Sequence, residues 1–277
     1  MCLVLLAWRA HPEYRLIVAA NRDEFYTRAT ESLTRWPDGL LAGRDLGADA
    51  PGTWLGFRPA DARFATVTNV RDPLDRVPHA RSRGALLMDY LRSADSPSAY
   101  QTAIDPARYL GYNLLTGDAD ALWWQSNRSG AAPAELVPGL HGLSNGPHLV
   151  SAPGEVVHSG PQEFEVTGVG APPVWPKVAD GLRELRDIIA TAPDSVEDYF
   201  ALLADRTEAA AELLPRTGIA PEFERAVSAR FVAHDLHGTR ASTVLLVRAD
   251  GSYVMAERTF GPHGAVQGAE TVSGRLG

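Results

Sequence analysis

The chain has 277 residues, of which 26 are basic and 34 acidic, so that its formal net charge is −8. Apolar residues make up 45% and charged residues 22%, an ordinary globular usage that excludes fibrous, coiled-coil and disordered classes. The acidic balance argues against nucleic acid and anionic membranes as partners, and the single cysteine excludes an internal disulfide.

Residues 2–9 and 14–20 are predicted to form two antiparallel strands joined by a short turn at 11–13. A hairpin with one face in water alternates apolar and polar residues. The run from Leu3 to Trp8 is instead apolar on both faces. The hairpin should therefore be covered on both sides, by a second sheet and by helices, which indicates a layered α/β/β/α arrangement.

Further strands are expected along the chain, and the expected helices are fewer than the strands. The strand candidates are residues 53–57, 63–70, 112–116, 121–125, 242–248 and 253–260. Asp250-Gly251 between the last two strands is a strong hairpin turn signal. The helix candidates are residues 84–93, 177–191 and 195–203, the last with Asp194 or Ser195 as its cap.

Strands near both ends of the chain favour a single α+β domain over residues 1–277. Residues 147–176 are rich in proline and glycine and are interpreted as a long loop, and residues 261–277 as a loose tail. No apolar stretch reaches the roughly 18 residues of a membrane span, and the first one is too short for a signal peptide. We expect a cytoplasmic protein without a transmembrane segment, whose oligomeric state stays open.

The most informative residue is the only cysteine, Cys2. Cytoplasmic processing removes an initiator methionine that precedes a small side chain, which would give Cys2 both a thiol and a free α-amine. The neutral amine can take the thiol proton, so that the nucleophile and its base lie on one residue. The alternative is a small residue that opens a strand.

Four polar residues, Asn21-Arg22-Asp23-Glu24, follow the second apolar strand. If the two strands pair, the end of the second lies beside the start of the first. Arg22 and Asp23 would then lie near Cys2, where they could stabilise a thiolate and orient an amine. The alternative is a solvated turn that contains an ordinary Arg–Asp pair.

Met1-Cys2 followed by the segment 16–26, with its Asn-Arg-Asp-Glu, resembles the signature of the NRDE family, also called the transport and Golgi organisation protein 2 family. Supporting matches follow in order and span residues 1 to about 260. They are the segments 52–56, 68–71, 82–84, 111–115, 142–145, 238–244 and 257–260. Ala29 and Pro51 depart from the usual pattern, and neither touches a proposed catalytic group.

This resemblance implies an N-terminal nucleophile hydrolase fold, a four-layer α/β/β/α sandwich with antiparallel sheets. The family's cysteine-first cousins cleave amides. By motif context their functional residues correspond to positions of this chain: Cys2, Arg22, Asp23, Asn69, Asn145 and Arg240.

The implied reaction is attack of the Cys2 thiolate on an amide or thioester carbonyl of a small-molecule substrate. Asn69 and Asn145 would donate to the oxyanion, Arg22 would lower the pKa of the thiol, and Asp23 would hold the amine. Either asparagine could instead be a turn residue, and Arg240 could pair with a carboxylate or bind substrate.

A rival hypothesis is a non-catalytic binding or trafficking protein for a hydrophobic ligand such as haem or an acyl-lipid.

The segment 142–146 matches a nucleophile-elbow pattern, but Pro147 leaves no room for the helix that this motif needs. His234 and His237 lack a third ligand at a useful spacing. We therefore expect neither a metal nor a cofactor.

Overall fold

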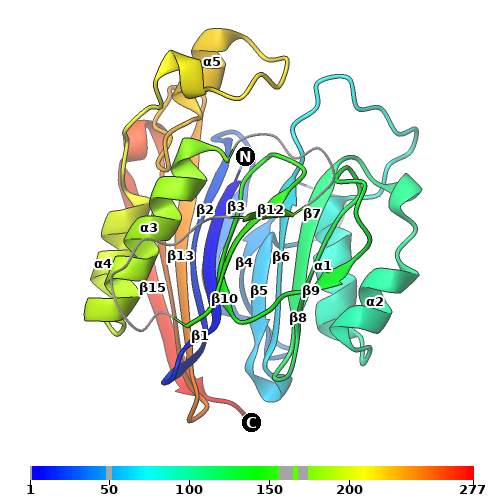
Figure 1. Ribbon diagram of the computed structural model, residues 1–277, viewed down its shortest axis with the longest axis vertical. Helices are drawn as coiled ribbons and strands as arrows, with labels where there is room; N and C mark the ends of the chain where they lie inside the picture. Colours follow the sequence, from blue (N-terminus) through cyan, green and yellow to red (C-terminus); the bar gives the residue numbers. More distant parts are fainter. Residues whose placement is uncertain (1, 48–51, 156–164, 168–173) are drawn as a thin grey trace.

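The computed structural model of the chain describes residues 2–47, 52–155, 165–167 and 174–277. Within these residues the chain forms two antiparallel sheets, with helices against the outer face of each sheet (Figure 1). The predicted α+β class with antiparallel sheets is confirmed.

The first sheet contains the strands at both ends of the chain, and each pair of neighbours is antiparallel. In spatial order its eight strands are β12 (Glu165–Thr167), β11 (Leu149–Pro153), β10 (Gly139–Leu143), β1 (Cys2–His11), β2 (Tyr14–Phe25), β13 (His237–Arg248), β14 (Ser252–Phe260) and β15 (Val266–Arg275).

The second sheet is built from consecutive strands in an antiparallel meander. Its seven strands are β3 (Thr30–Arg35), β4 (Leu41–Asp45), β5 (Leu55–Arg58), β6 (Arg63–Asn69), β7 (Tyr112–Gly117), β8 (Leu122–Ser126) and β9 (Ala134–Glu135).

The helices lie outside the two sheets. α3 (Pro176–Thr191) and α4 (Val196–Leu203) pack on the first sheet, and α1 (Arg83–Arg92) and α2 (Pro97–Ala103) pack on the second (Figure 1). The short α5 (Pro221–Ala226) precedes β13. Ser195 caps α4, since its side chain accepts a hydrogen bond from the Asp198 amide.

The position of β1 between two layers explains why its side chains are apolar on both faces of the strand. Leu3, Leu5 and Ala7 lie in the core against α3 and α4. The alternating residues Val4, Leu6 and Trp8 lie in the core between the two sheets. A strand alternates its side chains between faces, so both sets are buried only when both faces are covered. The prediction of a hairpin covered by a sheet and by helices is confirmed.

The predicted loose tail at 261–277 is wrong, because residues Val266–Arg275 form β15 and pair with β14 from Phe260 to Ser252. β15 is an edge strand whose side chains are mostly exposed. It therefore needs no apolar alternation, and its hydrogen bonds come from the β14 backbone. The sequence VQGAETVSGR shows neither an apolar run nor a strong strand pattern, which is why it was missed.

Other elements were also missed. The predicted loop at 147–176 contains β11 and β12, and its residues 156–164 and 168–173 lie outside the described part of the chain. β3, β4, β10 and α2 are short elements that the sequence reading left unassigned. They have too few residues to display a clear period.

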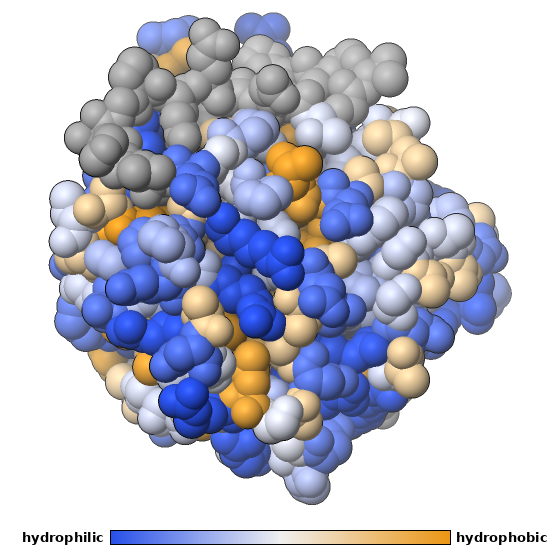
Figure 2. All heavy atoms as spheres, turned by 60° about the horizontal axis from the view of Figure 1, so that its bottom comes forward, coloured by the Kyte–Doolittle hydropathy of each residue, from blue (hydrophilic) through white to orange (hydrophobic). Residues whose placement is uncertain are grey.

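The molecular surface is largely hydrophilic on the face seen when the molecule of Figure 1 is turned so that its bottom comes forward. Figure 2 shows hydrophobic side chains there in small, separate groups. Such scattered exposure is normal for a folded chain.

Among the described residues, the helices are all too short or too polar to cross a membrane.

Candidate active site

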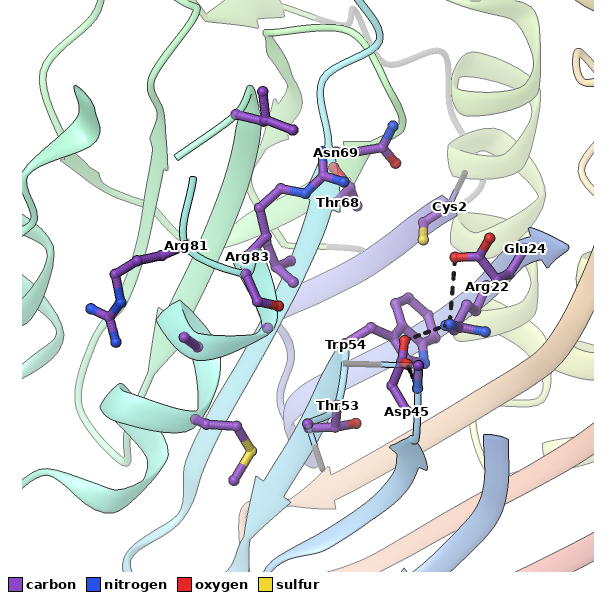
Figure 3. A pocket seen from close by; sticks show the side chains of 18 of the residues that line it. Cys2, Arg22, Glu24, Asp45, Thr53, Trp54, Thr68, Asn69, Arg81 and Arg83 are labelled. Carbon is purple, nitrogen blue, oxygen red and sulfur yellow. Dashed lines mark hydrogen bonds and ion pairs between the residues drawn. The ribbon is translucent and has the colours of Figure 1, made fainter. Parts of the chain in front are cut away.

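A cleft of about 780 Å³ lies at the end of the sheets where β1 begins. Cys2, at the start of β1, is directly opposite Arg22 of β2, and both side chains line the cleft (Figure 3). Asp23 and Asn69 line it too. The predicted juxtaposition of Cys2 with Arg22 and Asp23 is therefore present, because the hairpin register places the end of β2 beside the start of β1.

Asn145 reaches Cys2 from the segment that follows β10, the other neighbour of β1. The Cys2 amide nitrogen donates to Asn145 Oδ1 at 3.3 Å, and Ser144 Oγ donates to the Cys2 carbonyl at 3.0 Å. Asn145 Nδ2 donates to the carbonyl oxygen of Asn69 at 2.9 Å and to its Oδ1 at 3.0 Å. Asn145 thus joins the main chain of Cys2 to the end of β6.

Arg22 is held by two carboxylates, Asp45 from β4 of the other sheet and Glu24 from its own strand. Its Nη2 lies 2.8 Å from Asp45 Oδ2 and 3.6 Å from Glu24 Oε2, as the dashed lines of Figure 3 indicate. Arg28 binds the same Asp45 through Nε at 2.8 Å. Asp45 therefore orients Arg22, and the buried Nη1 of its guanidinium is left without a hydrogen bond among the described residues.

Asp23 is held on its other side by β13. Thr239 Oγ1 donates to Asp23 Oδ1 at 2.7 Å, and the same hydroxyl accepts the Val232 amide at 2.9 Å. Burial raises the pKa of the Asp23 carboxyl, and the positive charges of Lys177 and Arg22 oppose that rise. Lys177 is itself buried, which lowers its pKa to about 8, and its Nζ donates to the Val227 carbonyl at 2.9 Å. Asp23 is thus a buried carboxylate with basic neighbours.

The Cys2 thiol has a raised pKa, contrary to the lowering expected from Arg22. Burial is the dominant cause, and the Asp23 charge adds to it. Arg22 and a hydrogen bond from the Asp23 main chain act in the opposite direction. The sequence predicted the sign of the Arg22 effect but not the burial that outweighs it, since Cys2 is only 7% exposed.

Asn145 and Arg240 are the two candidates that do not line the cleft, and Arg240, unlike Asn145, has no hydrogen bond to Cys2 or Asn69 within the described part of the chain. Its Nη1 donates to the carbonyls of Phe25, Tyr26 and Arg28, at 3.0–3.3 Å, and its Nη2 to Thr30 Oγ1 at 3.1 Å. Arg240 therefore stabilises the segment between β2 and β3 by hydrogen bonds to its backbone and to Thr30.

Several residues of this region were not predicted individually. Asp45, Thr239 and Lys177 contact or surround the candidates, and Asn21 fixes the end of β2 by donating to the carbonyls of Leu203 and Arg230. Thr239 lies in a motif that carried the family resemblance, so a signal was present, but the motif alone did not distinguish Thr239 from Arg240. Asp45 and Lys177 lie outside the quoted motifs and have no local signal.

The chemistry available in the cleft is that of a thiol, amides, carboxylates and arginines. Within the described residues, no three or more His, Cys, Asp or Glu side chains are grouped so that they could hold a metal ion. A thiol with polar donors beside it can form and stabilise a covalent acyl intermediate.

Comparison with known proteins extends over nearly the whole chain. A family model described as Transport and Golgi organisation 2 matches residues 1–262. The Transport and Golgi organization protein 2 homologs of Bos taurus and Homo sapiens are 32% and 31% identical, each match covering 94% of this chain and 93% of the relative. The Drosophila melanogaster Transport and Golgi organization protein 2 is 28% identical, with 95% of both chains covered.

Proposed function

The chain belongs to the Transport and Golgi organisation 2 family, and from the surroundings of Cys2 we propose that it is an N-terminal nucleophile hydrolase that cleaves an amide or thioester bond. The observation that carries the proposal is the hydrogen bond from the Cys2 main-chain nitrogen to Asn145 Oδ1, beside a thiol that lines a cleft. That nitrogen becomes the α-amine once Met1 is removed, as would occur in the cytoplasm.

The arrangement of layers supports this proposal. Two antiparallel sheets lie between helices, and β1, whose first residue is Cys2, lies between β10 and β2 within the first sheet. An N-terminal nucleophile hydrolase uses the first residue of such a strand, because the amine and the side chain of one residue then meet the substrate together.

The proposed reaction starts with a neutral thiol. Because burial raises the pKa of Cys2, the thiol needs a base at the moment of attack, and the α-amine of the same residue can accept its proton. The sulfur then bonds to the substrate carbonyl carbon, and the C–N or C–S bond breaks as the leaving group takes the proton. Water attacks the resulting thioester on Cys2, which releases a carboxylic acid and restores the thiol.

The two asparagines receive different roles. Asn145 Oδ1 holds the Cys2 nitrogen, and Asn145 Nδ2 is engaged with Asn69. Asn69 is the asparagine of the two that lines the cleft, so its Nδ2 is assigned to the oxyanion. One such donor contributes about 2.7–4 kcal/mol in a known hydrolase. Arg22, fixed by Asp45, also lines the cleft and places its positive charge near the same developing charge.

The first experiment is the intact mass of protein made without an N-terminal tag, followed by incubation with acyl thioesters and acyl anilides. We expect the loss of one methionine, and then a mass adduct of one acyl group together with release of product. The Cys2→Ala variant should give neither adduct nor product while its urea unfolding transition is retained. Retention of Met1, or full activity of Cys2→Ala, would contradict the proposal.

A second function, binding of a hydrophobic ligand such as haem or an acyl-lipid, is favoured by one observation. The cleft wall includes Trp54, Val67 and Met88, and the thiol beside them has a raised pKa. In this case Cys2→Ala should bind haem or a fatty acyl compound as tightly as the wild type, and no acyl group should become attached to the wild-type chain.

A further inference from the structure

One of the charged groups that line the cleft lies at the start of α1. Arg83 is the first residue of that helix and lines the same cleft as Cys2. Figure 3 shows its side chain extending from the helix along β6 toward Asn69. The Cys2 thiol and Arg83 are near enough to influence each other electrostatically.

Arg83 differs from the other arginines of the cleft in its lack of a carboxylate partner. The others pair as Arg22–Asp45, Arg28–Asp45, Arg81–Asp89 and Arg92–Asp38. Arg83 donates to the Gly111 carbonyl at 3.2 Å and makes no ion pair within the described residues. Asp75, which could neutralise it, is bound instead by Arg128 at 2.7 Å.

An arginine in this position favours a negatively charged ligand. Burial lowers the pKa of Arg83, which means that the charge is partly removed from water without compensation from a bound carboxylate. The first turn of α1 contains no acidic residue that would compete for it. A planar guanidinium forms paired hydrogen bonds with the two oxygens of a carboxylate or a phosphate.

We propose that Arg83 binds an anionic group of the substrate, a carboxylate or a phosphate, and that the cleft thereby selects acidic amides or thioesters. The inference rests on the proposed function only in assigning the bond cleavage to Cys2. The binding of the anion depends on Arg83 and the cleft alone.

The test compares two alkylating reagents that differ in charge. Cys2 is the only cysteine, so the intact mass of the full chain reports its modification alone. At a pH where the thiolate is present, the alkylation rate with iodoacetate is divided by the rate with iodoacetamide. This ratio should be about tenfold higher for Cys2 than for free cysteine. This is the effect of about one charge-assisted hydrogen bond. Arg83→Gln should abolish the preference, and Arg83→Lys should keep part of it.

Arg81→Gln is the matched control, since Arg81 lines the same cleft but is paired with Asp89. It should leave the reagent preference unchanged. An equal preference in the wild type and in Arg83→Gln would overturn the inference, even if iodoacetamide labels Cys2 readily. That outcome leaves the proposed function standing.

A binding measurement separates the inference from the reactivity of the thiol. In the Cys2→Ala background, benzoate and phenyl phosphate are titrated by calorimetry with and without Arg83→Gln. Tighter binding of benzoate indicates a carboxylate substrate, and tighter binding of phenyl phosphate indicates a phosphate. We expect Arg83→Gln to weaken the preferred ligand about tenfold. Unchanged binding of both ligands would refute the anion site, whatever the alkylation experiment shows.

Discussion

Cys2 and Arg22 are direct partners in the β1–β2 ladder, yet the Arg22 guanidinium binds Asp45 of β4 in the other sheet. Opposed residues of an antiparallel pair project on the same face of the sheet, so the pairing brings the thiol and the guanidinium together. The Asp45 carboxylate neutralises part of the arginine charge. Burial dominates the pKa of the thiol, and the charge of Arg22 opposes it without reversing it.

We predict that the pH midpoint of Cys2 alkylation by iodoacetamide lies above that of free cysteine. Arg22→Gln should move the midpoint further upward, because Arg22 is one of the groups that oppose the effect of burial. Arg22→Lys should stay nearer the wild type. The measurement is the rate of mass gain from pH 6 to 10.

Arg28→Gln is the control for this prediction, since Arg28 also binds Asp45 but is not the strand partner of Cys2. Its midpoint should remain close to that of the wild type. A wild-type midpoint at or below that of free cysteine would mean that the thiol is not buried as described.

Asn145→Ala should both destabilise the fold and change the reactivity of Cys2. The substitution removes the acceptor of the Cys2 amide and the donor to Asn69, all in a buried position. Leaving buried polar partners without a hydrogen bond costs about 1–3 kcal/mol of unfolding free energy. Urea denaturation gives this loss, and alkylation by iodoacetamide gives the rate at Cys2.

Asn113→Ala provides the comparison. Asn113 is equally buried and donates to Thr68 Oγ1 and to the Gly146 carbonyl, but it has no hydrogen bond to Cys2 among the described residues. Both variants should lose similar stability, whereas the alkylation rate should change only in Asn145→Ala. A similar change of rate in both would show that general loosening of the fold, and not the Cys2 contact, controls the thiol.

The arrangement around Cys2 could be predicted because it depends on local rules. An apolar run on both faces of β1 implied two covering layers, and a short turn at 11–13 implied that the end of β2 returns to Cys2. Asn145 follows β10, a neighbour of β1 that no sequence pattern indicated. Its position was obtained from the family motif rather than from the residues themselves.

The partners that decide the charges could not be predicted. Asp45 reaches Arg22 from the other sheet, and Lys177 reaches Asp23 from α3, so both contacts depend on how layers pack. β15 was missed because an edge strand is stabilised by the backbone of β14 and places no demand on its side chains. Packing between layers leaves no short-range signal in the sequence.

Arg240→Gln should weaken the fold and leave Cys2 reactivity unchanged. The variant loses the hydrogen bonds to the carbonyls of Phe25, Tyr26 and Arg28, which we expect to cost about 1–2 kcal/mol in urea unfolding. The alkylation rate of Cys2 at fixed pH should match that of the wild type, in contrast to Arg22→Gln. If a folded Arg240→Gln chain instead lost its alkylation, the catalytic role implied by the family motif would be restored.

Glu257 of β14 connects stability to pH. It is buried beside β3, where its Oε1 accepts the Leu33 amide at 2.6 Å and its Oε2 accepts from Thr243 Oγ1 at 3.1 Å. Burial raises its pKa from 4.5 to about 7. The folded chain therefore holds this proton more tightly than the unfolded chain. The resulting stabilisation is complete below about pH 4.5 and is lost as the pH rises through 7.

We predict that Glu257→Gln removes this pH dependence, because glutamine cannot ionise. Its amide oxygen can still accept from the Leu33 amide, and its amide nitrogen can donate to the Thr243 hydroxyl. At pH 8 the variant should exceed the wild type by up to about 3 kcal/mol in unfolding free energy, and near pH 4.5 it should gain nothing. Urea denaturation at both pH values measures this. Glu270→Gln, the exposed residue opposite Glu257 on β15, should change the pH dependence little. If Glu257→Gln followed the wild-type pH profile, the carboxyl would not be the group that titrates in the fold.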